Sequence, residues 1–130
     1  MTPSDATPAL RALTVIRAAA GAALLLAPEA TLAPLTGVSP DERARLFARA
    51  LGIRHLLEAT VLWRVPSPRA VRLGAAVDAV HAATTLGLFA DRRRRRLAAV
   101  NCLTASGFAI AGWAVASGTS QPAASLPQTP

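Results

Sequence analysis

Long apolar stretches with very few charged positions dominate this chain. The stretch Leu97–Ser117 carries no charged residue at all. A run of about 20 apolar residues is long enough, as a helix, to cross the ~30 Å hydrocarbon core of a bilayer. Other apolar stretches have a similar length but contain isolated ionisable residues, such as Arg17 in the first and Asp78 in the third. This pattern predicts a membrane protein built from helices of membrane-spanning length.

Three of the predicted helices begin in the same way, with a short polar residue followed by proline. These pairs are Thr7-Pro8, Ser39-Pro40 and Ser67-Pro68. The hydroxyl can accept a hydrogen bond from the first turn, and proline suits the first helical position because its missing N–H would be unpaired there. Glu42 follows Ser39 at the spacing of a capping box. Asp91 can cap a fourth helix.

The helix ends follow from proline and glycine. Pro28 and Pro66 end the first two helices, the third ends near Asp91, and Gly118 ends the last. The sequence therefore predicts an all-α fold, an up-down bundle of four transmembrane helices. The predicted helices are 8–27, 40–64, 68–90 and 92–117, in a membrane domain 8–117 between an N-terminal tail 1–7 and a disordered C-terminal tail 118–130.

Composition and charge agree with a membrane location. Hydrophobic residues make up 52% of the chain and charged residues only 16%, which is too apolar for an ordinary small soluble domain. Much of the net charge of +7 lies in one block beside the last apolar stretch, namely Arg92, Arg93, Arg94, Arg95 and Arg96. No aromatic residues are interleaved with this block to stack on bases, which argues against a nucleic-acid partner.

The arginine block predicts topology and a lipid contact. Arginine beside a membrane segment resists translocation, so the positive-inside rule places the block in the cytoplasm and both termini outside. The same block forms a lipid-facing basic patch that attracts anionic head groups.

Ionisable residues inside the predicted spans form a buried polar cluster. Its members are Arg17, Arg54, His55, Glu58, Asp78 and His81. Each charge costs about 2.5–3.5 kcal/mol on insertion scales unless it is paired or hydrated. In a hairpin that turns at Pro66-Ser67, Arg54 lies at the level of Asp78, which predicts an ion pair. The deep charges also sum to zero.

Two interpretations of this cluster remain open. In the first, it fixes which helices pair and in what register. In the second, Asp78 carries a proton or binds a cation, Arg54 is its partner or an anion clamp, and His55 and His81 are relay groups. A metal or haem site built from these histidines with Cys102 lacks any recognised ligand spacing, so the sequence predicts no metal and no cofactor.

Two segments carry a family resemblance. Ala50-Leu51-Gly52-Ile53-Arg54-His55 is followed by Arg72-Leu73-Gly74 and by Asp78-Ala79-Val80-His81. The chain resembles small four-helix bacterial membrane proteins of unknown function that carry Gly-x-Arg-His or Gly-x-Arg-Asp in one helix and Asp in the next. The resemblance implies Gly52, Arg54, His55 and Asp78 as characteristic positions, and that group brings no established activity.

No soluble-enzyme signature is present: the sequence has no glycine-rich phosphate loop, no Gly-x-Ser-x-Gly and no acidic metal cluster. We therefore expect a small multi-pass protein of the bacterial inner membrane with a structural or partner-interaction role. Its expected partners are the bilayer and a second copy or another membrane protein. The alternative is a small transporter or membrane enzyme that uses the polar cluster for proton or substrate handling.

Overall fold

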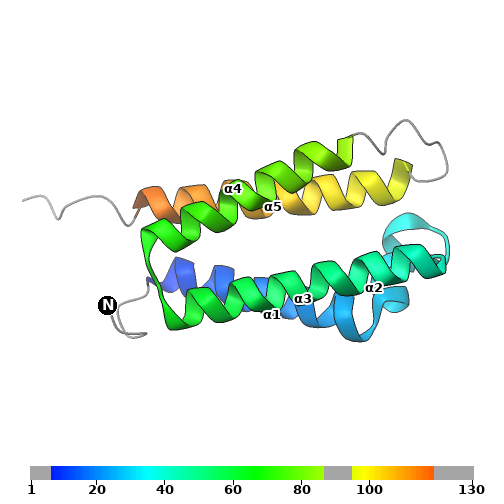
Figure 1. Ribbon diagram of the computed structural model, residues 1–130, viewed down its shortest axis with the longest axis horizontal. Coiled ribbons are helices and arrows are strands. Elements are labelled where there is room, and N and C mark those ends of the chain that lie inside the picture. Colours follow the sequence, from blue (N-terminus) through cyan, green and yellow to red (C-terminus); the bar gives the residue numbers. More distant parts are fainter. Residues whose placement is uncertain (1–6, 87–94, 119–130) are drawn as a thin grey trace, which may run out of the picture.

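The computed structural model describes residues 7–86 and 95–118, and these residues form helices and no strand (Figure 1). The all-α class is therefore confirmed. The helices are α1 (Pro8–Leu26), α2 (Pro28–Thr36), α3 (Glu42–Arg64), α4 (Pro68–Thr85) and α5 (Arg95–Gly118).

Of the three predicted helix caps that lie within the described residues, two are confirmed and one is wrong. Thr7 accepts a hydrogen bond from the N–H of Leu10 at 3.2 Å, and Ser67 caps α4 in the same way. In α3, however, Asp41 is the cap and accepts from the N–H of Ala44 at 2.8 Å. A carboxylate satisfies this donor and also interacts favourably with the positive end of the helix dipole. The helix consequently begins two residues later than its predicted start at Pro40, and Ser39 forms no capping box.

The third predicted helix ends earlier than expected. α4 ends at Thr85, where the N–H of Leu86 bonds to the carbonyl of Ala83 in a tighter turn. The predicted continuation to residue 90, the cap at Asp91 and both tails beyond residues 7 and 118 lie outside the described residues.

A short helix, α2, occupies the segment between the first two predicted helices, where the sequence predicts no helix. Pro28 follows the end of α1, as expected, but it also begins α2 at the position where proline is favoured. The helix ends at Gly37, whose φ of 73° is in the left-handed region that glycine tolerates. Arg96 donates from Nη1 to the carbonyl oxygen of Thr36 at 3.2 Å, which joins the end of α2 to the start of α5.

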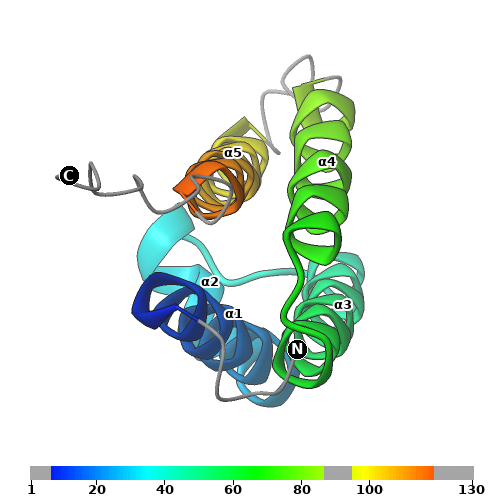
Figure 2. The ribbon, with the colours of Figure 1, turned by 90° about the vertical axis from the view of Figure 1, so that its left-hand side faces the viewer.

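The four long helices are arranged as two antiparallel pairs, α1 with α3 and α4 with α5 (Figures 1 and 2). Small residues allow the close approach within each pair. A Cβ added to Gly52 would lie only 2.7 Å from the carbonyl oxygen of Gly21, and one added to Gly112 would lie 3.1 Å from the Cβ of Ala75. Helices of different pairs lie farther apart, so side chains fill the interior between the two pairs.

Large apolar side chains are exposed on every long helix. Examples are Ile16, Leu57, Leu73 and Ile110, which are 59%, 63%, 68% and 71% exposed. Trp63, near the end of α3, and Trp113, in the last two turns of α5, are also exposed, and both helices end at the same end of the bundle (Figure 1). The surface therefore has an apolar character on several faces.

Among the described residues, α1 and α5 are long and apolar enough to cross a membrane. In the most apolar part of each helix, only about a third of the residues are buried within the chain: 33% in α1 and 28% in α5. The core helix of a soluble protein can be equally long and apolar, but most of its residues are buried within the protein. By this composition test α3 and α4 do not qualify, because they carry more charged residues.

Candidate functional site: a buried ring of charges

Asp78 lies at the centre of the site and is completely buried on α4. Its Oδ2 accepts a hydrogen bond from Nη2 of Arg17 at 2.6 Å, and its Oδ1 accepts one from Nη2 of Arg54, also at 2.6 Å. The structure thus contains the Arg54–Asp78 ion pair that the hairpin register predicts. Both carboxylate oxygens are occupied by guanidinium donors.

Glu58 closes the arrangement from α3. Its Oε2 accepts from Nη1 of Arg17, and its Oε1 accepts from Nε of Arg54 at 3.0 Å and lies 2.8 Å from Nη2. Cations and anions therefore alternate around a closed cycle of Arg17, Glu58, Arg54 and Asp78, which we call the charge ring. Its formal charge is zero, and it joins α1 and α3 of one helix pair to α4 of the other.

Arg17 extends the site to α5. It is only 2% exposed, and its guanidinium carbon lies 4.4 Å from the ring centroid of Phe108. A cation over an aromatic face is stabilised by the quadrupole of the ring, and more so when both are shielded from water. Phe108 is thus the residue through which α5 contacts the site. One buried donor of Arg17, its Nε, has no hydrogen-bond partner among the described residues.

The two histidines occupy different positions. His55 is 2% exposed, and its ring centroid lies 5.1 Å from that of Phe108. His81 stacks on Phe47 at 6.0 Å between centroids, with an interplanar angle of 22°. Within the described part of the chain, Nδ1 of His55 and Nε2 of His81 are buried without a hydrogen-bond partner. The structure therefore places four of the six predicted residues in the charge ring and the histidines outside it.

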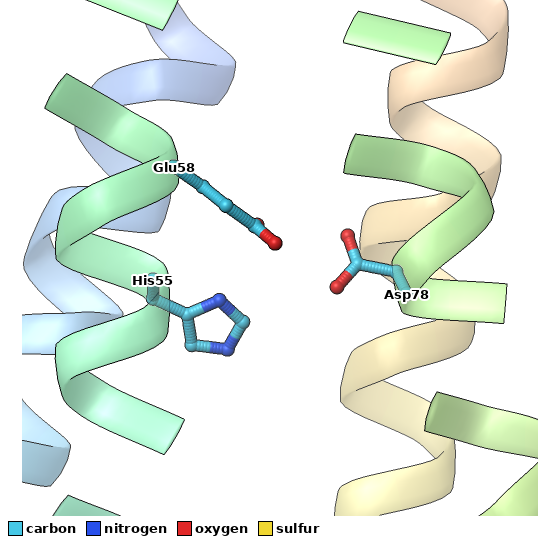
Figure 3. A group of neighbouring side chains, drawn as sticks. All are labelled: His55, Glu58 and Asp78. Carbon is cyan, nitrogen blue, oxygen red and sulfur yellow. The ribbon is translucent and has the colours of Figure 1, made fainter. Parts of the chain in front are cut away.

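His55, Glu58 and Asp78 also form a group that has the geometry to hold a metal ion. Figure 3 shows His55 and Glu58 projecting from α3 toward Asp78 on α4, and their ligand atoms lie within 4.8 Å of one another. Imidazole and carboxylate are ordinary zinc ligands. Here, however, every carboxylate oxygen already accepts from an arginine. A divalent ion would have to displace these donors and would add two positive charges to a neutral ring, so the donor set fits arginine better than a metal.

Within the described part of the arginine block, Arg96 contacts the end of α2. Arg95 and Arg96 are exposed at the start of α5, and Arg96 bonds to Thr36. The predicted patch members Arg92, Arg93 and Arg94 lie outside the described residues.

The sequence prediction matched the deep cations Arg17 and Arg54 with the deep anions Glu58 and Asp78, but it assigned no individual carboxylate to Arg17. It also did not include Phe108 in the site. Helix length indicates that Arg17 lies deep in the bundle, but the partner of a residue on α1 depends on how the two helix pairs pack. A single phenylalanine in an apolar helix gives no distinguishing signal. The close approach at Gly21 and Gly52 was likewise not predicted, although glycine inside a helix is a recognised signal of close packing.

Comparison with known proteins gives no match: no protein-family model, no curated protein and no solved structure matches the chain. The resemblance to small four-helix membrane proteins therefore stays a prediction.

Proposed function

We propose that this chain is a small multi-pass protein of the bacterial inner membrane, in which α1, α3, α4 and α5 cross the bilayer. The observation that carries the proposal is the reversed distribution of polarity. The charge ring is in the interior, with Asp78 fully buried, whereas large apolar side chains such as Ile110 are on the surface. In a membrane this distribution is favourable, because charges face the bundle interior and apolar groups face lipid.

Helix length supports the same proposal. The four long helices have 18 to 24 described residues, which corresponds to about 27–36 Å at 1.5 Å per residue. The hydrocarbon core of a bilayer is ~30 Å thick. The exposed tryptophans Trp63 and Trp113 lie toward one end of the bundle, where aromatic residues of membrane proteins contact the interface.

The charged residues of α3 and α4 are compatible with insertion. Arg54, Glu58 and Asp78 neutralise one another within the charge ring, and Asp78 is fully buried while Arg54 and Glu58 are 24% and 19% exposed. Exposed arginines nearer the helix ends, such as Arg64 and Arg69, can extend to the interface.

We assign the charge ring a structural role in this membrane protein, with a second copy or another membrane protein as partner. The geometry favours this role because all four carboxylate oxygens are saturated by guanidinium donors. A carboxylate in this state is a poor proton carrier, since its protonation would leave the two arginines with only one negative charge between them.

The alternative is a small transporter or membrane enzyme that handles protons or a substrate. It is favoured by the unpartnered buried nitrogens of His55 and His81 close to the bundle interior. Proton flux into proteoliposomes separates the two roles. A structural role predicts no flux above that of empty liposomes, whereas a flux that His55→Phe abolishes without loss of folded protein would favour the alternative.

The membrane location is tested by fractionation. We expect the full chain to sediment with bacterial membranes, to resist an alkaline carbonate wash and to require detergent for release. Recovery of folded protein in the soluble fraction would contradict the proposal. A peripheral protein released by carbonate would also contradict it, because the four proposed spans predict integral insertion.

A further inference from the structure

Arginines gather at the end of the bundle that holds the turn between α3 and α4. Arg64 is the last residue of α3, and Arg69 lies in the first turn of α4. Arg72 follows on α4, and Arg11 lies near the start of α1, which is at the same end (Figure 1). All four side chains are exposed. Three helices therefore bring positive charge to one end, which we call the basic end.

No carboxylate of the described residues neutralises the basic end. Glu58 and Asp78 are engaged in the charge ring. The other described carboxylates belong to α2 or to the start of α3, at the opposite end of the bundle; they are Glu29, Asp41 and Glu42. The positive charge of the basic end can therefore be complemented by an anionic partner.

The turn that connects Arg64 to Arg69 is held by local contacts. Pro66 is fully buried, and the N–H of Ser67 donates to the carbonyl oxygen of Val65 at 2.8 Å. Ser67 also caps α4 through its Oγ. Neither arginine forms an ion pair with another described residue. A short, well-held turn thus presents two guanidinium groups without a counter-charge of their own.

Exposed apolar side chains accompany these arginines. Trp63 and Val65 flank Arg64 in the sequence, Trp113 lies toward the end of α5, and these three apolar residues are each 56% exposed. Aromatic residues and arginines with apolar stems are enriched where a membrane protein meets the lipid head groups. A second copy of this end would be repelled by its like charge. An anionic lipid complements both the charge and the apolar groups.

We propose that the basic end binds an anionic phospholipid, whose phosphate contacts Arg64 and Arg69 and whose acyl chain lies against Trp63. Guanidinium suits this ligand because it can donate two hydrogen bonds to one phosphate. Arg11 and Arg72 add to the positive field here, whatever else they contact. The proposal rests on the membrane location proposed above and adds a lipid class to it. This site is separate from the predicted patch of the arginine block, which leads into α5 at the other end.

The two tryptophans of the chain are local reporters, because both lie toward the basic end. The full chain is reconstituted in vesicles of phosphatidylglycerol and phosphatidylcholine with the same acyl chains, and either lipid is brominated near its head group. Bromine quenches tryptophan fluorescence only at close range, so the two series compare how strongly each lipid associates with this end. Both leaflets have the same composition, so the orientation of the protein does not affect the result.

We expect the relative association constant of phosphatidylglycerol to exceed that of phosphatidylcholine by at least about fivefold, since one arginine near an anionic surface contributes about this factor. Arg64→Gln combined with Arg69→Gln lowers this preference at least about twofold. The corresponding pair of lysine substitutions keeps the charge and most of the preference. The matched control, Arg43→Gln combined with Arg49→Gln, removes the same charge from exposed positions toward the other end of α3 and leaves the preference unchanged.

Equal quenching by the two brominated lipids would overturn the proposal and leave the membrane location intact. Quenching by neither lipid would contradict the membrane location on which the proposal rests. An unchanged preference in the double glutamine variant, or an equal loss in the control variant, would overturn the assignment to the basic end. If the double glutamine variant does not fold, Arg69→Gln alone takes its place, and a lowered preference supports the site whereas an unchanged one contradicts it.

Discussion

At the scale of single residues, the central feature is a fully buried carboxylate that is shared by two guanidinium groups. Asp78 bonds to Arg17 and Arg54 at 2.6 Å each. Burial of an isolated charge is strongly unfavourable, and pairing compensates for it only when the remaining hydrogen-bonding sites are also satisfied. Glu58 meets most of this condition by accepting from Nη1 of Arg17 and Nε of Arg54, and Nε of Arg17 is left without a hydrogen-bond partner among the described residues.

Asp78→Asn is therefore expected to be strongly destabilising. The substitution keeps the size of the side chain but leaves the two arginines with only one carboxylate. Loss of one partner from a buried ion pair costs about 3–5 kcal/mol, and we expect a loss of that order in unfolding free energy, measured by denaturation in detergent.

The matched control is Glu29→Gln, which removes a carboxylate from an exposed pair with Arg45 at 3.8 Å. We expect a change below about 0.5 kcal/mol there. Equal stability of Asp78→Asn and the wild type would contradict a stabilising role for the charge ring.

The sequence predicted part of this site for a clear physical reason. Arg54 and Asp78 lie on consecutive helices, α3 and α4, which one short turn connects. The register of this hairpin therefore places the two residues at the same level. Arg17 is on α1, whose position relative to α4 depends on the packing of alanine-rich faces that look alike in sequence. Its two carboxylate partners and its contact with Phe108 could not be assigned before the structure.

At the scale of helices, glycine determines where two helices approach closely. Gly21 and Gly52 face each other across α1 and α3, and neither has space for a Cβ. We expect Gly52→Ala to lower the unfolding free energy by about 1–3 kcal/mol through steric overlap. Gly74→Ala, at an open helical position, is expected to raise it by up to about 1 kcal/mol, since alanine favours a helix. Chemical denaturation of both variants measures this difference, and a stable Gly52→Ala would contradict the close approach.

The end of α2 gives a second expectation at this scale. Gly37 has a positive φ of 73° and terminates the helix beside the contact between Thr36 and Arg96. A non-glycine residue in this conformation costs about 1–2 kcal/mol. We expect Gly37→Ala to lose about this amount in denaturation experiments, whereas Gly118→Ala, at the end of α5 with open space around it, stays near the wild type. Similar stability of the two variants would contradict the left-handed conformation of Gly37.

The helices of the sequence prediction and of the structure differ for reasons of local chemistry. Pro28 was interpreted only as the end of a helix, yet proline equally suits the first position of the next one, and α2 begins there. Similarly, two capping side chains compete before α3, and the carboxylate of Asp41 bonds to the helix rather than the hydroxyl of Ser39. The long apolar stretches predicted the four long helices, whereas the start of α2 and the capping residue of α3 became known only from the structure.

At the scale of the whole molecule, the proposed membrane location raises the question of which end of the bundle faces the cytoplasm. The ends of α3 and α5 and the starts of α1 and α4 lie at one end of the bundle, and α2 lies at the other (Figure 1). The positive-inside rule applied to the arginine block places the α2 end in the cytoplasm.

Cysteine labelling tests this orientation in a Cys102→Ala background. Val65 and Ser39 are both exposed and lie at opposite ends of the bundle. We expect a membrane-impermeant maleimide to label Val65→Cys in intact spheroplasts and Ser39→Cys only after permeabilisation. The reverse pattern would place both termini in the cytoplasm and contradict the predicted orientation.

The arrangement of the whole bundle also depends on the charge ring, because the two helix pairs have few close backbone contacts with each other. Arg54 on α3 and Asp78 on α4 connect one pair to the other. The sequence predicted antiparallel helices, but it did not predict that α1 pairs with α3, since no charge pattern distinguishes these apolar faces.

The most direct test of a ring that joins the two helix pairs is the coupling free energy between Arg54 and Asp78. It is measured by unfolding of the wild type, Arg54→Gln, Asp78→Asn and the double mutant in detergent. Each single change leaves an uncompensated charge, whereas the double change restores neutrality. We expect the double mutant to be more stable than the sum of the single losses implies, with a coupling of at least about 1 kcal/mol. Additive losses within about 0.3 kcal/mol would contradict the account.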